Sequence, residues 1–430
     1  MSSNPTRKAV QLTLIGGEHS FFSAKARSYL RYKGQQGDFF QEALATLDMY
    51  RQAILPLVGV NFIPVLLVHD EHGNIQDAIQ DTSLIVDYLE KAFPHLPSVH
   101  PTTPKQRFVS YLIELWADEW LKMPAMHYRW SFLEENQKYL VHEWGKVSTP
   151  HLSVDERDQS VLNAKSKGAS FNAMRQTLPL LGITPETIPE LERSFLDLLQ
   201  LLEAHFRQHS FLLGERPCLG DFALIGPFYA HLYRDPKPSS ILRSKAPVFC
   251  EYIERMNGLR PAYEATFSMD SSGKRLVAPP EGVAQFGRVY AHGEFLPNDT
   301  IPDTIVPMIS KIFQEHIPIL LSTCQGLAEY LKESDPPADQ VLPRSIGFHG
   351  FQWGNARSKR LSYPYDVWML QRCLDSIGKD EEQIVFPFIK QFQNGQQLLD
   401  KVNWIKSDLR LKIVKFKLYR DSNSPLQSKI

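Results

Sequence analysis

The chain has 430 residues, 43% of them hydrophobic and 22% charged, and its formal net charge is -1. This length allows two to three domains, and the composition is typical of a soluble globular protein. A charge near zero gives no reason to expect a nucleic acid or an anionic membrane surface as partner. No stretch approaches the roughly 18 apolar residues of a membrane span, and no signal peptide follows the initiating methionine. The four cysteines are Cys218, Cys250, Cys324 and Cys373. Because they are far apart and lack the spacing of a metal site, we expect no metal and a reducing, cytoplasmic setting.

The first patterned stretch predicts a strand, a turn and a helix. The apolar run Val10–Ile15 ends at Gly16-Gly17, and a polar and aromatic turn containing Ser20 follows. The residues Ala24–Arg31 then continue as a helix. This order places the hydroxyl of a serine at the N-terminus of a helix.

A second part of the same stretch predicts two more strands and a helix. Asn61–Val68 is strand-like, and its proline belongs at the strand entry, where a cis Ile63-Pro64 bond is expected. The return strand is Ile75–Ile79. Asp81-Thr82-Ser83 then caps a helix that includes Leu84–Glu90.

Taken together, these pieces resemble the thioredoxin-like N-terminal domain of the glutathione transferase superfamily. Ser20, five residues before Lys25, lies where Ser and Cys classes carry their catalytic residue. The resemblance implies that Ser20 activates the glutathione thiol and that Ile63 and Pro64 pair with its cysteinyl backbone. It also implies that Asp81 and Thr82, followed by the family's pattern of Ile85, Tyr88 and Leu89, hold the γ-glutamyl end.

Each of these residues also has an ordinary structural role. Ser20 is a good helix cap, although Ser23 offers the same chemistry, and His19 is a second candidate for activating the thiol. Asp81 and Thr82 are ordinary helix caps as well. The sequence leaves these alternatives open.

The proline-rich segment 94–104 marks the first domain boundary, and the pattern beyond it is helical. Cys218 at a helix start with Asp221 three residues on resembles the capping box of the transferase C-terminal domain. The resemblance implies an α/β thioredoxin-like domain at residues 9–93 and an all-α domain at residues 104–266. It also implies that an electrophile pocket includes Trp116, Trp120 and Tyr128, although helical spacing favours core positions for these rings. His205 and His209 have the spacing of a metal pair but no third ligand nearby, so we expect a frayed helix end and no metal.

The resemblance ends near Thr266, and residues 267–430 form a mixed, mainly helical extension. A short helix is predicted after Pro307, and Pro318 either kinks it or starts a second helix. Residues 348–360 have the composition of an aromatic and basic loop. The tail from Leu409 to Leu418 fits a half-exposed strand or a solvated basic helix, and less well a membrane or nucleic-acid segment. Because the extension is rich in aromatic residues that need burial, we expect residues 302–420 to dock on the body.

Two functions follow from these patterns. The first is a glutathione transferase, which would be a cytoplasmic homodimer using glutathione as co-substrate to attack a small apolar electrophile. The second is a catalytically silent interaction module in which the extension binds a partner. The motifs around Ser20, Pro64 and Asp81 favour the first function, and the long extension favours the second.

Overall fold

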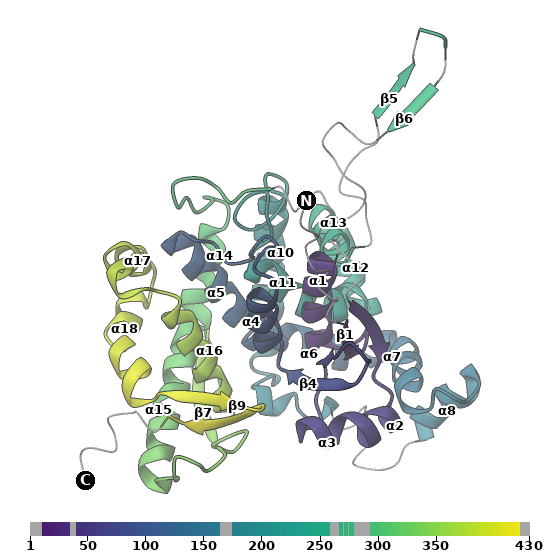
Figure 1. Cartoon of the computed structure of the whole chain (residues 1–430). Coiled ribbons are helices and arrows are strands. Elements are labelled where there is room, and N and C mark those ends of the chain that lie inside the picture. Colours follow the sequence, from purple (N-terminus) through teal and green to yellow (C-terminus); the bar gives the residue numbers. More distant parts are fainter. Residues whose placement is uncertain are drawn as a thin grey trace.

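A computed structural model describes residues 11–34, 40–163, 174–258, 266–269, 271–273, 275–278 and 293–421. Its first part is an α/β domain, its second part is helical, and the extension adds helices and hairpins (Figure 1). The predicted fold class is confirmed. No helix in these described ranges is long and apolar enough to cross a bilayer.

The N-terminal domain is built on one four-stranded sheet in the order β2-β1-β3-β4. β1 is parallel to β2 and antiparallel to β3, and β4 returns antiparallel to β3. The strands are β1 (Gln11–Gly16), β2 (Phe40–Leu44), β3 (Val65–His69) and β4 (Ile75–Gln80). Pro64 precedes β3 through a cis bond with Ile63, as predicted, so the proline removes no hydrogen bond from the central ladder.

Side chains alternate between the two faces of this sheet, as a period of two requires. Leu12 and Leu14 pack on the face covered by α1 (Phe21–Gly34) and α4 (Thr82–Ala92). Ile15, on the other face, packs with the residues of a short helical segment that contains α2 (Leu47–Met49) and α3 (Leu55–Val58). Both faces of the central strands are therefore covered, which explains their nearly continuous apolar sequence.

The second part is mainly helical in the residues that the structure describes. Its helices are α5 (Pro104–Glu119), α6 (Lys122–Trp130), α7 (Leu133–Ser148), α8 (Val154–Asn163), α10 (Ile188–Phe206), α11 (Leu219–Pro227), α12 (Pro236–Lys245) and α13 (Pro247–Met256). The predicted capping box is present at α11, where the Cys218 N–H donates to Asp221 Oδ2 at 2.8 Å. His205, by contrast, is not at a frayed end. It is buried, and its ring nitrogens lie 2.7 Å from Thr304 Oγ1 and 3.1 Å from the Phe211 carbonyl.

In its described residues the extension contains helices and three two-stranded hairpins. Its elements are β5 (Thr266–Met269), β6 (Arg275–Ala278), α14 (Val306–Glu315), α15 (Ile317–Ser334), β7 (Phe348–Trp353), β8 (Ala356–Leu361), α16 (Pro364–Asp375), α17 (Glu382–Lys390), α18 (Gly395–Leu399), β9 (Leu411–Val414) and β10 (Lys417–Arg420). Pro318 begins a second helix. Residues 348–360 form most of a hairpin, so the expected loop is wrong. The basic tail is a hairpin too, with the turn residues Lys415 and Phe416 at positive φ.

The sequence does not predict the hairpin β7–β8 because its aromatic residues do not keep a period of two: Phe348 is 57% exposed, on the face opposite Phe351. Phe351 and Trp353 point inward and are buried, whereas Gln352 between them is exposed. The Phe351 ring lies against Gly182, where an added Cβ would come within 2.5 Å of it. Contact with a distant segment therefore decides the strand, and that contact is invisible to a local pattern.

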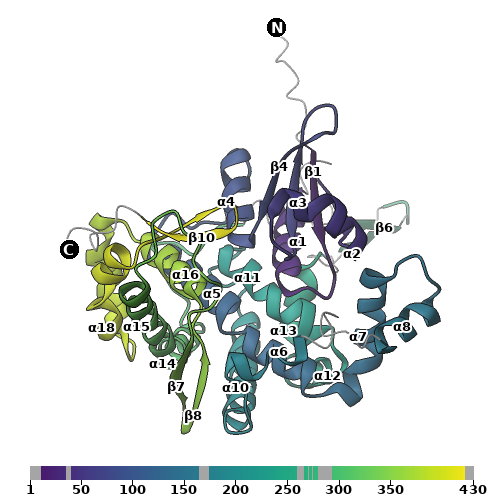
Figure 2. The same ribbon diagram turned by 90° about the horizontal axis from the view of Figure 1, so that it is seen from below.

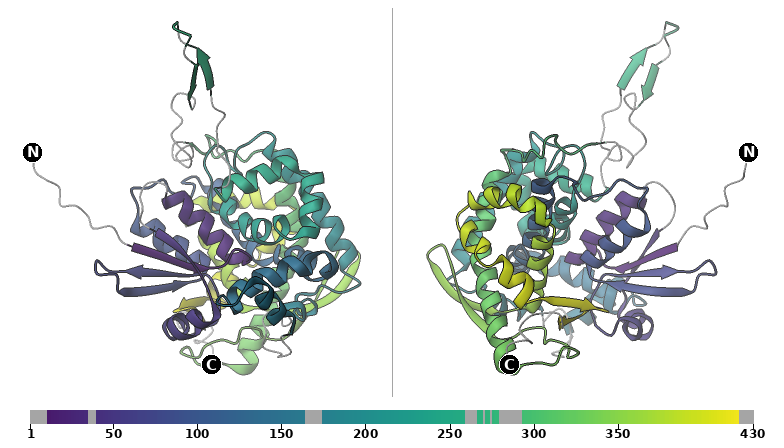
Figure 3. Two further views of the ribbon diagram at one scale, coloured as in Figure 1. Left: turned by 90° about the vertical axis from the view of Figure 1, so that its right-hand side faces the viewer. Right: turned by 60° about the vertical axis from the view of Figure 1, so that its left-hand side comes forward.

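The helices of the extension lie on one side of α5, and the four-stranded sheet lies on another (Figures 2 and 3). The two carboxylate oxygens of Asp299 accept hydrogen bonds from the Lys105 and Gln106 N–H groups, each at 2.9 Å. Asp299 thus satisfies donors in the first turn of α5, which has no side-chain cap of its own. The Trp120 ring, near the other end of α5, lies 4.7 Å from the Trp353 ring and 5.5 Å from the His316 ring.

We expect Trp120→Ala to destabilise the whole chain by about 3–5 kcal/mol, because it leaves a cavity between the body and the extension. Chemical denaturation of the full-length protein measures this loss. Phe348→Ala is the control, since that ring is 57% exposed and its loss should change stability by about 0.5 kcal/mol or less. Equal stability of the two variants would show that the Trp120 contacts contribute nothing to folding.

Candidate functional site

The turn between β1 and α1 brings Ser20 to the start of the helix. The Ser20 hydroxyl oxygen accepts a hydrogen bond from the Ser23 N–H at 3.3 Å, so Ser20 caps α1. The Ser23 hydroxyl instead accepts from the Gly17 N–H at 3.3 Å. This packing requires a glycine at position 16, where a Cβ would lie 2.9 Å from the Ser23 hydroxyl oxygen. Because Ser20 uses its oxygen as acceptor, its proton can be donated to a ligand.

The cis Ile63-Pro64 step lies directly beside this turn. A Cβ added at Gly16 would be 3.9 Å from Pro64 Cβ, and one added at Gly17 would be 3.7 Å from Ile63 Cδ1. Tyr50 fixes the backbone just before this step. Its hydroxyl donates to the Val60 carbonyl at 2.9 Å and accepts from the Phe62 N–H at 3.1 Å. Two of the three predicted motifs are thus neighbours in space.

The third motif, Asp81-Thr82, lies at the start of α4. Asp81 Oδ1 accepts from the N–H groups of Ser83 at 2.9 Å and of Leu84 at 3.4 Å, which makes Asp81 the N-cap. Asp81 Oδ2 accepts from the hydroxyl of Tyr365, a residue of the extension. Thr82 is only 3% exposed. The cap role is therefore present, and the role in holding glutathione stays a prediction.

Lys25, five residues after Ser20, makes contacts across the domain boundary. It is fully buried, and its Nζ lies 2.7 Å from Glu114 Oε1 and 2.5 Å from Asp118 Oδ2, both on α5. Burial alone would lower the pKa of Lys25, but the two carboxylates raise it above its usual value. Lys25 is thus a charged link between the two domains of the body.

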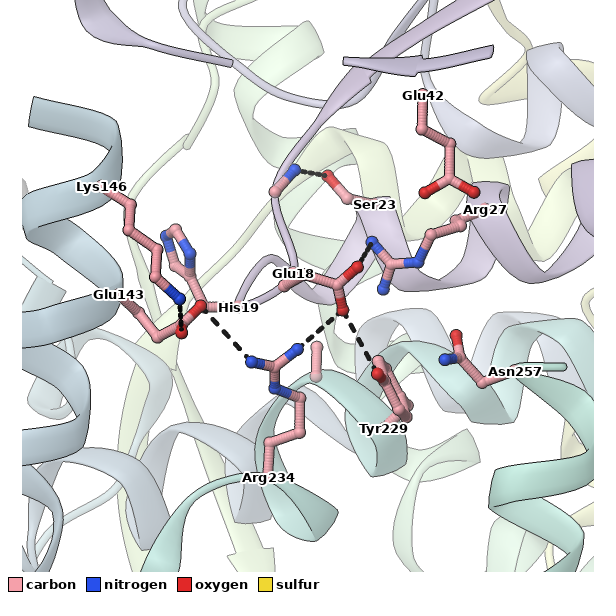
Figure 4. A network of polar contacts seen from close by, with 12 residues as sticks. Glu18, His19, Ser23, Arg27, Glu42, Glu143, Lys146, Tyr229, Arg234 and Asn257 are labelled. Carbon is pink, nitrogen blue, oxygen red and sulfur yellow. Dashed lines mark hydrogen bonds and ion pairs between the residues drawn. The ribbon is translucent and has the colours of Figure 1, made fainter. Parts of the chain in front are cut away.

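The sequence analysis missed Glu18, which joins the turn to the helical domain (Figure 4). Its carboxylate accepts from Arg234 Nη1 at 2.7 Å and from the Tyr229 hydroxyl at 3.3 Å, and it forms an ion pair with Arg27 at 3.3 Å. Arg234 also pairs with Glu143 at 3.4 Å. A single glutamate in a turn has no sequence signal that separates it from an ordinary solvated residue.

His19 lies next to Ser20 but faces the helical domain. Its ring centroid is 4.4 Å from that of Trp144. Burial, together with Arg129, Arg234 and other nearby cations, lowers the pKa of His19 to about 3. The ring is therefore neutral at pH 7 and carries no positive charge that could stabilise a thiolate.

The three predicted pocket aromatics are all in the core, with exposed fractions of 1% for Trp116, 2% for Trp120 and 3% for Tyr128. Trp120 contacts the extension, as described above. Tyr128 stacks at 5.6 Å on Phe132 and lies 4.8 Å from Phe195. Their role in an electrophile pocket stays a prediction, and these contacts favour the core alternative.

The fold and the turn define a two-domain protein of the thioredoxin-like plus all-helical class. Residues 14–98 match the model described as glutathione S-transferase, N-terminal domain. Residues 174–259 match the model described as glutathione S-transferase, C-terminal domain. Residues 14–98 and 174–259 are therefore domains of the glutathione transferase superfamily, and residues 260–430 lie outside both matches.

Solved structures of this fold include a beta-etherase, LigF, from Sphingobium sp. strain SYK-6, at 18% identity and a TM-score of 0.39. The match covers 59% of this chain and 96% of that chain. A Tau class glutathione S-transferase from mango is also 18% identical, with a TM-score of 0.34 and coverage of 57% and 88%. Rice GST1, solved in complex with glutathione, is 19% identical, with a TM-score of 0.32 and coverage of 57% and 86%. No curated protein matches the chain.

We expect Lys25→Met to cost about 3–5 kcal/mol of unfolding free energy, because it removes the cation that Glu114 and Asp118 share inside the protein. Chemical denaturation at pH 7 measures the loss. Lys91→Met, at an exposed position on α4, is the matched control and should change little.

The triple variant Lys25→Met, Glu114→Gln, Asp118→Asn should recover much of this stability, since neutral side chains avoid the penalty for unpaired charge. If the single and triple variants were equally unstable, the loss would come from packing around the lysine stem and not from charge.

Proposed function

We propose that the protein is a glutathione-dependent transferase that activates the glutathione thiol for attack on an apolar electrophile. The observation that carries the proposal is the contact between the Gly16-Gly17 turn, which ends in Ser20, and the cis Ile63-Pro64 step. These residues lie within the segment that matches the N-terminal family model. Conjugation, dehalogenation, ether cleavage and isomerisation all fit this chemistry.

Thiol activation is the task that the turn suits. A free thiol has a pKa of about 8.5, so only a few per cent is thiolate near pH 7. A hydroxyl that donates to the sulfur favours the thiolate, as does the positive end of the helix that starts at Phe21. Each unit by which the thiol pKa falls corresponds to about 1.4 kcal/mol. Ser20 is the candidate donor, because His19 is buried against the helical domain.

The rest of glutathione would extend along the same edge of the domain. The backbone of Ile63 is a hydrogen-bonding partner for an extended peptide, and Pro64 fixes its direction. Asp81 and Thr82, at the start of α4, would hold the ammonium and the carboxylate of the γ-glutamyl end. On this proposal the protein is a cytoplasmic homodimer, and its second substrate is a small electrophile.

A silent interaction module is the second candidate, and one observation favours it. Tyr365 already occupies one acceptor site of Asp81, and Thr82 is nearly inaccessible. Retention on immobilised glutathione, with elution by free glutathione, supports the transferase. A protein that passes through the column unretained supports the module.

Asp81→Asn should weaken glutathione binding by about 1.5–3 kcal/mol, the range for a hydrogen bond to a charged group. Asparagine keeps the capping oxygen but loses the charge that would hold the ligand ammonium. Titration calorimetry measures the affinity, and Asp77→Asn, on exposed β4, is the control. Equal affinity of the wild type and Asp81→Asn would remove Asp81 from the site.

Ser20→Ala should lower turnover with an aryl or alkyl halide and raise the pKa of bound glutathione, with little change in glutathione affinity. Selective stabilisation of the thiolate predicts this pattern. At a pH below the thiol pKa, each unit by which that pKa rises lowers the thiolate fraction about tenfold. The measurement is the absorbance of the thiolate and kcat as functions of pH.

Ser20→Thr is the matched variant, since it keeps both the hydroxyl and the cap and should retain most activity. An unchanged pH profile in Ser20→Ala would assign thiol activation to a backbone donor.

A further inference from the structure

The helix α16 of the extension lies along α4, the helix that begins at the expected γ-glutamyl site. Three residues on one face of α16 contact α4 in order: the Tyr365 hydroxyl donates to Asp81, and Met369 Sδ lies 3.8 Å from the Ser83 hydroxyl. At the far end, Arg372 Nη1 and Nη2 bind the Asp87 carboxylate at 2.6 and 3.1 Å. Spacings of four and three residues place these side chains on one stripe.

We infer that Tyr365 is a positioning residue for glutathione, and that the extension thereby completes the γ-glutamyl end of the binding site. The observation behind this inference is the hydrogen bond from the Tyr365 hydroxyl to Asp81 Oδ2. The inference rests on the proposed function and adds to it a residue from outside both matched family domains.

The hydrogen bond from Tyr365 leaves room on Asp81 for a ligand. A carboxylate has about four acceptor sites. Oδ1 accepts from two helix N–H groups, and Oδ2 accepts from Tyr365, so one site on Oδ2 remains for a ligand ammonium. With both oxygens held, the carboxylate has one orientation before the ligand arrives, and less conformational entropy is lost on binding.

The charge on Asp81 depends on the same contact. Burial raises the pKa of Asp81, and the Tyr365 hydroxyl, Lys25 from α1 and Arg372 from α16 act against this rise. Asp118, from α5, faces the same region, and burial raises its pKa to about 7. Burial also raises the pKa of Tyr365, so its hydroxyl stays protonated and remains a donor. Removal of this hydroxyl therefore leaves Asp81 easier to protonate, and a protonated Asp81 cannot pair with an ammonium.

We expect Tyr365→Phe to weaken glutathione binding about 3- to 10-fold at pH 7, the equivalent of one hydrogen bond. Because the pKa of Asp81 is then higher, the loss of affinity relative to the wild type should grow as the pH is lowered. Titration calorimetry of the full-length chain measures both effects. Tyr363→Phe, two residues away, is the matched control, and it should match the wild type.

Two related thiols separate positioning from a general structural effect. γ-Glutamylcysteine contains the γ-glutamyl end and should show the same loss in Tyr365→Phe, whereas cysteinylglycine lacks that end and should bind both proteins equally. A similar loss for all three thiols would overturn the inference, since it would report a general change of the domain. Melting temperatures of each variant show that the folded proteins are compared.

The failure of this inference differs from the failure of the proposed function. If the wild type binds glutathione and Tyr365→Phe binds it equally well at every pH, Tyr365 has no positioning role and the transferase proposal stands. If the wild type does not bind glutathione, both are overturned. Should Tyr365→Phe not fold, Asp81→Asn provides the second test. Its affinity should depend on pH less than that of the wild type, because only the titration of the glutathione thiol then remains.

Discussion

The relative placement of the two domains and the extension depends on the contacts of one buried carboxylate, that of Glu114. Glu114, on α5, lies 2.7 Å from Lys25 Nζ of α1 and 2.8 Å from the Ser83 hydroxyl of α4. Its other oxygen is 3.9 Å from Arg372 of α16. Burial would raise the pKa of Glu114, but Lys25 and Arg372 lower it overall. One side chain thus joins the thioredoxin-like domain, the helical domain and the extension.

The charges around Glu114 explain why the extension belongs to the fold. Lys25 faces two buried carboxylates, those of Glu114 and Asp118, so the body alone has an excess of negative charge at this point. Taking charges out of water costs several kcal/mol each unless they are paired. Arg372 contributes the second cation and also pairs with Asp87. A body without α16 would keep the buried anions and lose one of the two cations.

The local parts of the fold were predictable from the sequence because their causes are local. The cis Ile63-Pro64 step, the cap at Asp81 and the Cys218-Asp221 pair each follow from residues a few positions apart. The contacts of Glu18 with the helical domain and those of Lys25 were not predictable, since these partners are 89 to 216 residues away in the chain. The hairpin at residues 348–360 was missed for the same reason, because its buried face packs on distant residues.

The same network connects the two ends of the expected glutathione site. Lys25 lies one turn beyond the Ser20 cap on α1, and Ser83 lies two residues beyond Asp81 on α4, so Glu114 fixes both helix starts relative to each other. Tyr365 and Arg372 place the extension on this network. If glutathione binds Asp81 more tightly when Tyr365 is in place, linkage requires that glutathione stabilise the docked extension by the same free energy. Binding of a ligand in the first domain and packing of the extension are then coupled equilibria.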